Sequence, residues 1–188
     1  MSLISRANLV KIHMLLAAFM FPVACMFLVT GGLYTWGIKG SYDTEVHMIS
    51  LSKPLNQDHQ QLQTLVEHEL MKLSIAVPSG NAKIKKGGTS FKFEWTGSDR
   101  DVVLAPTSDS LAAKLIIKET TWYRHLVQLH KAKGGQLFKV YAAILAVSLF
   151  IILFSGFIMA WQVPKYRKLA LIFSAAGLCM FLLMIGAG

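Results

Sequence analysis

The sequence predicts an α+β membrane protein, in which a small α+β domain is inserted between the first and second of three transmembrane helices. Hydrophobic residues make up 54% of the 188 residues and charged residues only 15%, which is less charge than a soluble domain of this length carries. The apolar residues are concentrated in three runs. All ten acidic residues lie between Asp43 and Glu119, which separates an aqueous segment from a membrane part.

Each of the three apolar runs is long enough to cross a bilayer. The first, from Leu9 to Trp36, contains one lysine and one histidine, and the other two, 140–161 and 169–188, contain no charged residue. A hydrocarbon core of about 30 Å needs about 20 apolar residues in a helix, and a signal-peptide h-region has only about 7–15. We therefore expect these segments along the chain: 1–37 with the first helix, 38–135 as the inserted domain, 136–162 as the second helix, 163–168 as a turn, and 169–188 as the third helix.

Positive charges flank these runs and predict an orientation. Arg6 and Lys11 lie at the start of the first run, and the turn contains "KYRK" at 165–168. Dense positive charge in short segments favours the cytoplasm, whereas long loops translocate largely regardless of their charge. We therefore expect a cytoplasmic N-terminus and an outer location for 38–135. The net charge of +9 comes mainly from these flanks, so membrane lipids are expected partners and nucleic acid is not.

The inserted segment is predicted to contain one helix followed by an antiparallel sheet. Apolar residues between Leu55 and Leu73 recur with a helical period, and Pro78–Ser79–Gly80 ends that region. "FKFEW" at 91–95 then alternates apolar and polar residues, as a half-buried strand does. "DVVLAP" at 101–106 completes a hairpin, and "AAKLIIKET" at 112–120 adds a strand. The tight turn of this hairpin explains the two nearby acids, Asp99 and Asp101.

Three stretches of the chain carry a resemblance to a known family. They are "KIHMLLAAFMFPVACMFLVTGGLYTW", "FEWTGSDRDVVLAP", and "LHKAKGG" followed by "SGFIMAW". Together they resemble the PepSY-associated transmembrane family, in which a PepSY domain lies between membrane helices. The resemblance implies a PepSY-like domain at 38–135, on the periplasmic side of a bacterial inner membrane. Larger members have four or more membrane helices, whereas this chain has three apolar runs.

Two functions follow from this resemblance. Some larger members are ferric-siderophore reductases that bind haem b through membrane histidines, which implies an electron carrier that reduces ferric iron or other extracytoplasmic acceptors. Compact PepSY modules are associated with regulating peptidases, which implies a non-enzymatic accessory subunit whose PepSY-like domain binds a partner protein. Either function implies a homo-oligomer or a larger membrane complex. The chain contains no GxSxG, HExxH, P-loop or Rossmann glycine pattern.

His130, His13 and His125 are the candidate haem ligands. A six-coordinate haem needs two imidazoles on opposite faces of one macrocycle. His13 begins the first helix and His130 precedes the second, so the two lie at opposite ends of spans roughly 30 Å long. His125 and His130 are five residues apart, about 140° around a helix. The second ligand would therefore come from another chain or from a methionine. Alternatively, these histidines cap helix ends or contact headgroups.

Overall fold

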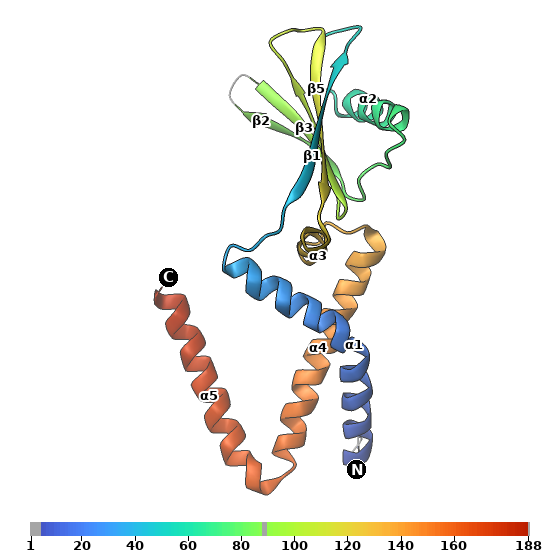
Figure 1. Ribbon diagram of the computed structural model, residues 1–188. Coiled ribbons are helices and arrows are strands. Elements are labelled where there is room, and N and C mark those ends of the chain that lie inside the picture. Colours follow the sequence, from blue (N-terminus) through green and yellow to red (C-terminus); the bar gives the residue numbers. More distant parts are fainter. Residues whose placement is uncertain (1–4, 88–89, 188) are drawn as a thin grey trace. The chain divides into compact units, whose positions relative to one another are not determined.

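The computed structural model describes residues 5–87 and 90–187, and within them the chain forms five helices and one antiparallel sheet (Figure 1). Three helices are long and apolar enough to cross a membrane: α1 (Arg6–Thr35), α4 (Gln136–Trp161) and α5 (Pro164–Ala187). The expected α+β architecture with three candidate spans is thus confirmed. The chain divides into two compact units, Cys25–Ala142 and the remainder.

The connection between α4 and α5 is shorter than expected. Only Gln162 and Val163 separate the two helices, so most of the segment 163–168 belongs to the first turns of α5 rather than to a turn. Pro164 begins α5. Proline suits this position because the N–H of a first helical residue has no acceptor within the helix, so its absence in proline costs no hydrogen bond. Arg167 Nε donates to the carbonyl of Trp161 at 2.7 Å and so closes the end of α4.

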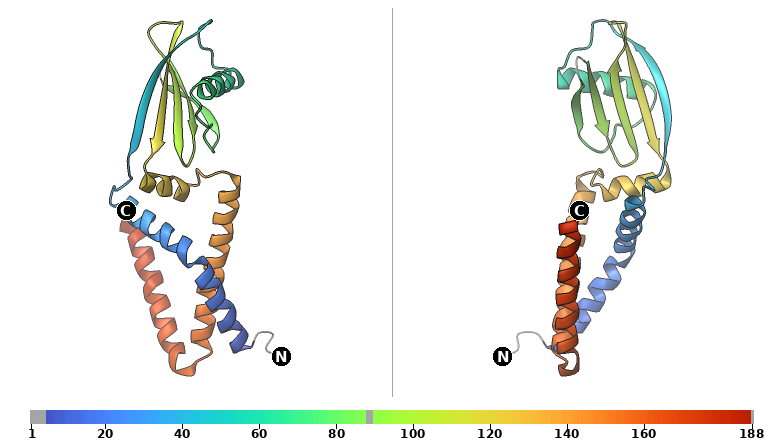
Figure 2. Two further views of the ribbon diagram at one scale, coloured as in Figure 1. Left: turned by 45° about the vertical axis from the view of Figure 1, so that its right-hand side comes forward. Right: turned by 90° about the vertical axis from the view of Figure 1, so that its left-hand side faces the viewer.

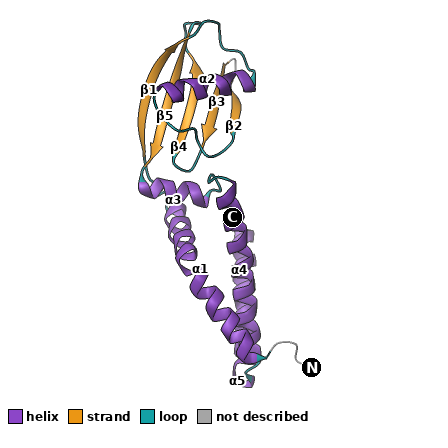
Figure 3. Cartoon of the chain, turned by 90° about the vertical axis from the view of Figure 1, so that its right-hand side faces the viewer, coloured by secondary structure: helices purple, strands orange, loops and turns teal. Residues whose placement is uncertain are grey.

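The sheet has five antiparallel strands in the order β1-β5-β4-β3-β2 (Figure 3). The three predicted strands are confirmed, and two more form the edges of the sheet. The bounds are β1 (Tyr42–Ser50), β2 (Ala82–Gly87), β3 (Ser90–Thr96), β4 (Arg100–Pro106) and β5 (Ala112–Thr120).

One face of the sheet packs against the predicted helix, α2 (His59–Lys72), as Figure 2 shows. The helix begins later than Leu55, where the predicted helical period starts, because Asp58 is its N-cap. The Asp58 carboxylate accepts from the backbone N–H groups of Gln60 and Gln61. The core between helix and sheet consists of Leu62, Val66, Leu70, Phe91, Phe93, Trp95, Val102, Leu104, Ala113, Leu115 and Ile117.

The alternation in β3 is confirmed residue by residue. Phe91, Phe93 and Trp95 are buried on the α2 side, while Lys92 is exposed on the other face. Glu94 shares that outer face but is only partly exposed, because it forms an ion pair with Lys85 of β2 at 2.5 Å. The sheet therefore has an apolar inner face and a lysine-bearing outer face.

A short helix at the end of the segment 38–135, not predicted as an element of its own, is α3 (Trp122–His130). It ends because Ala132 adopts a left-handed conformation with φ of 56°, which a regular α-helix does not accommodate. Arg124 of α3 donates to the carbonyl of Lys39 at 3.1 Å, and Tyr123 Oη donates to the carbonyl of Ile38 at 3.3 Å. α3 is thus bonded to the segment that follows α1.

Candidate histidine sites and a buried polar cluster

His130, the last residue of α3, packs against α1. Its Nδ1 lies 2.8 Å from Thr30 Oγ1, and its ring lies 4.8 Å from the ring of Phe27, centroid to centroid. Thr30 is 2% exposed, so water does not compete for its hydroxyl group. The imidazole is therefore held in place at Nδ1, while the side chain as a whole stays partly exposed.

His13 makes a similar contact inside the other compact unit. Its Nδ1 lies 2.8 Å from Ser155 Oγ of α4, and Ser155 is 4% exposed. The next residue, Gly156, leaves room for the edge of the imidazole ring. His13 therefore bonds two candidate spans, α1 and α4, to each other.

His125 contacts the sheet rather than α1. Its Nδ1 donates to the carbonyl of Ser98, between β3 and β4, at 2.9 Å, because a carbonyl oxygen can only accept. The side chain also lines an open groove of about 530 Å³ together with Asp99 and Trp122. His125 and His130 thus bond to different segments, and their five-residue spacing on α3 accounts for this.

The structure does not gather the candidate histidines into one site. His13 belongs to a different compact unit from His125 and His130. Across residues 5–87 and 90–187, no group of three or more His, Cys, Asp and Glu side chains is arranged to hold a metal ion. Each histidine is therefore a separate candidate ligand, bonded at Nδ1.

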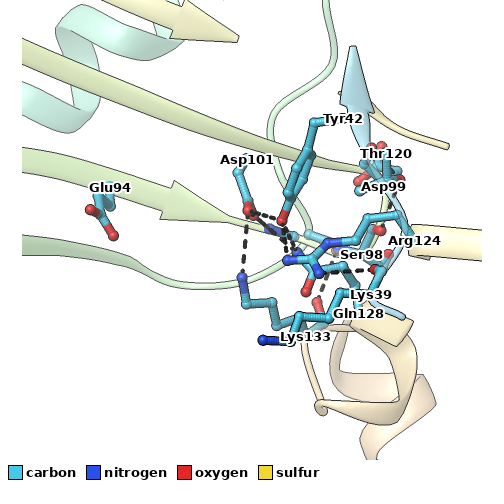
Figure 4. A network of polar contacts seen from close by, with 12 residues as sticks. Lys39, Tyr42, Glu94, Ser98, Asp99, Asp101, Thr120, Arg124, Gln128 and Lys133 are labelled. Carbon is cyan, nitrogen blue, oxygen red and sulfur yellow. Dashed lines mark hydrogen bonds and ion pairs between the residues drawn. The ribbon is translucent and has the colours of Figure 1, made fainter. Parts of the chain in front are cut away.

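A buried polar cluster lies where β1, β4 and α3 meet, centred on Asp101 (Figure 4). Asp101 is 8% exposed. Its carboxylate accepts from Tyr42 Oη at 2.8 Å and from Gln128 Nε2 at 3.3 Å, and it lies 3.5 Å from Lys133 Nζ. Tyr42 Oη in turn accepts from Arg124 at 2.8 Å. We call these five residues the Asp101 cluster.

Burial of the Asp101 cluster shifts two of its ionisable groups. Burial raises the pKa of the Tyr42 phenol above its ordinary value, although the hydrogen bond from Arg124 opposes this. Burial also lowers the pKa of Lys133, although the nearby Asp101 carboxylate opposes this. Both shifts have the same origin, because desolvation disfavours the charged form of either group.

The hairpin turn accounts for only part of the surroundings of Asp101. Asp101 lies within β4, opposite Lys118 of β5, and its side chain is buried. Asp101 also accepts from the backbone N–H of Gly97 in the turn at 3.2 Å, but its other partners come from β1, from α3 and from the segment after α3, which no local pattern could have revealed. Only the folded arrangement of the sheet and α3 brings them to Asp101.

Comparison with protein-family models, curated proteins and solved structures gave no match to this chain.

Proposed function

We propose that this protein is a multi-pass inner-membrane electron carrier that binds haem b, with His130 as one axial ligand and a residue of another chain as the second. The observation that supports this most is the attachment of His130 at Nδ1 to a buried oxygen. Histidines that bind metals almost always use one ring nitrogen for the metal and donate the other N–H to such an oxygen. In the described part of the chain, Nε2 of His130 has no hydrogen-bond partner.

The three candidate histidines fit a haem to different degrees. His13 and His130 are both fixed at Nδ1 by a buried hydroxyl group, so each can offer Nε2 to an iron. His125 is fixed by a backbone carbonyl on the sheet, and we propose no shared haem with His130. Bound haem would supply one-electron chemistry at its iron, and the chain's own contribution is to hold the imidazoles at Nδ1.

An accessory role is the second candidate, and the outer face of the sheet favours it. Val46 and Met48 of the edge strand β1 are 50% and 64% exposed on that face. Lys114 on the neighbouring strand β5 is exposed directly opposite Met48. Exposed apolar side chains with a lysine beside them suit a partner protein with an acidic surface. On this reading the PepSY-like domain binds that partner while the helices insert beside a larger complex.

Absorbance spectra separate the two candidates. The full-length protein, purified from haem-replete cells, is expected to show a Soret band and a dithionite-reduced α band. His130→Ala should lose this haem or convert it to a high-spin form, because one axial nitrogen is gone. His125→Ala should leave it largely intact. His13→Ala should affect only a separate haem near the cytoplasmic end of the helices.

The matched control for these variants is His68→Ala, since His68 is an exposed residue of α2 far in sequence from all three candidates. A folded wild-type protein without haem would overturn the electron-carrier proposal in favour of the accessory role. Haem retained in full by His130→Ala would instead remove His130 as the ligand.

The proposed orientation is tested with reporter fusions. A reporter that is active only in the cytoplasm should work when fused after Lys168, because "KYRK" favours that side, and should fail when fused after Gly97, within the sheet domain. An active fusion after Gly97 together with an inactive one after Lys168 would reverse the topology.

A further inference from the structure

Two histidines in different units of the chain are held by the same local arrangement. Each contacts a hydroxyl residue followed directly by glycine on a long helix: Thr30–Gly31 of α1 contacts His130, and Ser155–Gly156 of α4 contacts His13. We call each of these a hydroxyl–glycine pair. The Nδ1-to-oxygen distance is 2.8 Å in both. The repetition indicates a common task for the two pairs.

The direction of each hydrogen bond follows from the other partner of the hydroxyl group. Thr30 Oγ1 lies 2.6 Å from the carbonyl oxygen of Met26, one turn earlier in α1. A carbonyl can only accept, so the single hydroxyl hydrogen of Thr30 points there. Thr30 Oγ1 must then accept from His130, whose Nδ1 carries the hydrogen.

The hydrogen-bond direction at Ser155 follows in the same way. Its Oγ donates to the carbonyl oxygen of Ile152 at 3.0 Å and therefore accepts from Nδ1 of His13. Both hydroxyl residues are almost fully buried, at 2% for Thr30 and 4% for Ser155. A polar group left unpaired there would lose a hydrogen bond that water cannot replace. The direction of each hydrogen bond is therefore hard to reverse.

We infer that Thr30 and Ser155 are positioning residues that hold neutral His130 and His13 in the Nδ1–H tautomer, so that each presents its Nε2 lone pair to an electron-pair acceptor. The class of ligand is a metal centre that binds a neutral imidazole, and its identity as haem iron rests on the proposed function. A ligand that needs a hydrogen-bond donor at Nε2 does not fit this tautomer.

The glycine of each pair sets how closely the ring approaches the helix. A Cβ added at Gly31 would lie 3.1 Å from Cε1 of His130, which is tighter than an ordinary contact, so the ring would have to move. At Gly156 the corresponding distance to Cε1 of His13 is 3.7 Å, an ordinary contact. Gly31 is therefore needed for the position of His130, while an alanine at position 156 is tolerated.

The tautomer is measured by ¹⁵N NMR of the full-length protein, labelled at the histidine ring nitrogens, in lipid nanodiscs without added haem. His130→Asn identifies the signals of His130. We expect Nδ1 of His130 to be protonated and Nε2 to be unprotonated in the wild type. Thr30→Val removes the acceptor at nearly constant shape and should shift His130 toward the Nε2–H tautomer. Thr30→Ser keeps the acceptor and should restore the wild-type signals.

Ligand binding is measured in parallel by titrating the same samples with hemin. Changing the group that orients a metal-binding histidine typically weakens metal binding roughly 10–100-fold, and we expect a loss of this order for Thr30→Val but not for Thr30→Ser. Gly31→Ala should weaken hemin binding as well. Gly32→Ala is the matched control, because nothing in the described structure lies within 4 Å of a Cβ added there.

The outcomes distinguish this inference from the proposed function. A wild-type His130 protonated at Nε2, or a Thr30→Val variant with unchanged ring signals, would overturn the positioning role whether or not hemin binds. Predicted ring signals in a protein that binds no hemin would uphold the positioning role and overturn the haem proposal. Equal effects of Gly31→Ala and Gly32→Ala would overturn the role of Gly31.

Discussion

Replacing Phe93 by aspartate is expected to unfold the sheet domain while the three long helices stay in the membrane. Phe93 is fully buried in the core between α2 and the sheet and makes an edge-to-face contact with Trp95 at 6.4 Å. Removing a buried phenylalanine side chain typically costs about 3–5 kcal/mol, and an unpaired carboxylate in the same place costs more. Small domains are stable by only about 5–15 kcal/mol, so the loss should exceed what this core can supply.

Limited proteolysis of the membrane-inserted protein measures this effect, and extraction with alkaline carbonate measures whether the helices remain inserted. The matched control is Lys92→Asp, which places the same side chain on the adjacent residue but on the exposed outer face of β3. Substitutions at such surface sites usually change stability by less than about 0.5 kcal/mol. Equal protease resistance of the two variants would show that the inward face of β3 does not belong to the core of the domain.

The strands that the sequence predicted are those with one buried face. β3, β4 and β5 lie in the middle of the sheet, and their inward residues are apolar at every second position. The missed strands, β1 and β2, are the two edges, where only a few side chains are even partly buried. An edge strand buries few side chains, so its sequence need not alternate regularly between apolar and polar residues, and lysines are common there. Its pairing is visible only in the fold.

The candidate site was predictable in part. A histidine beside an apolar run is visible in the sequence, so His13 and His130 could be named. The spacing of His125 from His130 predicted that the two side chains point away from each other. The hydroxyl–glycine pairs could not be found, because Thr30 is 100 residues from His130 and Ser155 is 142 residues from His13. Serine, threonine and glycine are common in membrane helices, so the pairs carry no local signal.

The Asp101 cluster explains how the sheet is joined to the segments that lead toward the long helices. Tyr42 lies at the start of β1, after α1, and Lys133 lies between α3 and α4. Asp101 of β4 contacts both side chains, so one carboxylate links the incoming and outgoing segments to the centre of the sheet. Its removal should therefore affect stability more than a single lost hydrogen bond would.

Asp101→Ala is expected to destabilise the sheet domain by about 3–5 kcal/mol, the usual effect of breaking a buried ion pair from one side. The variant would leave the positive charges of Lys133 and Arg124 without their buried counter-charge. It would also leave the phenol of Tyr42 without an acceptor. For a domain of this size, 1 kcal/mol corresponds to about 4–8 °C in Tm, so we expect Tm to fall by at least about 12 °C in a thermal unfolding experiment on the full-length protein.

The matched control is Asp99→Ala, which removes the same side chain two residues earlier. The Asp99 side chain is 43% exposed and pairs with Arg100 near the surface, and exposed pairs contribute only about 0–1 kcal/mol. Adding Lys133→Met to Asp101→Ala should recover part of the lost stability, because it removes one of the unpaired charges. A Tm for Asp101→Ala within a few degrees of that for Asp99→Ala, or no recovery in the double variant, would show that the buried charge does not hold α3 to the sheet.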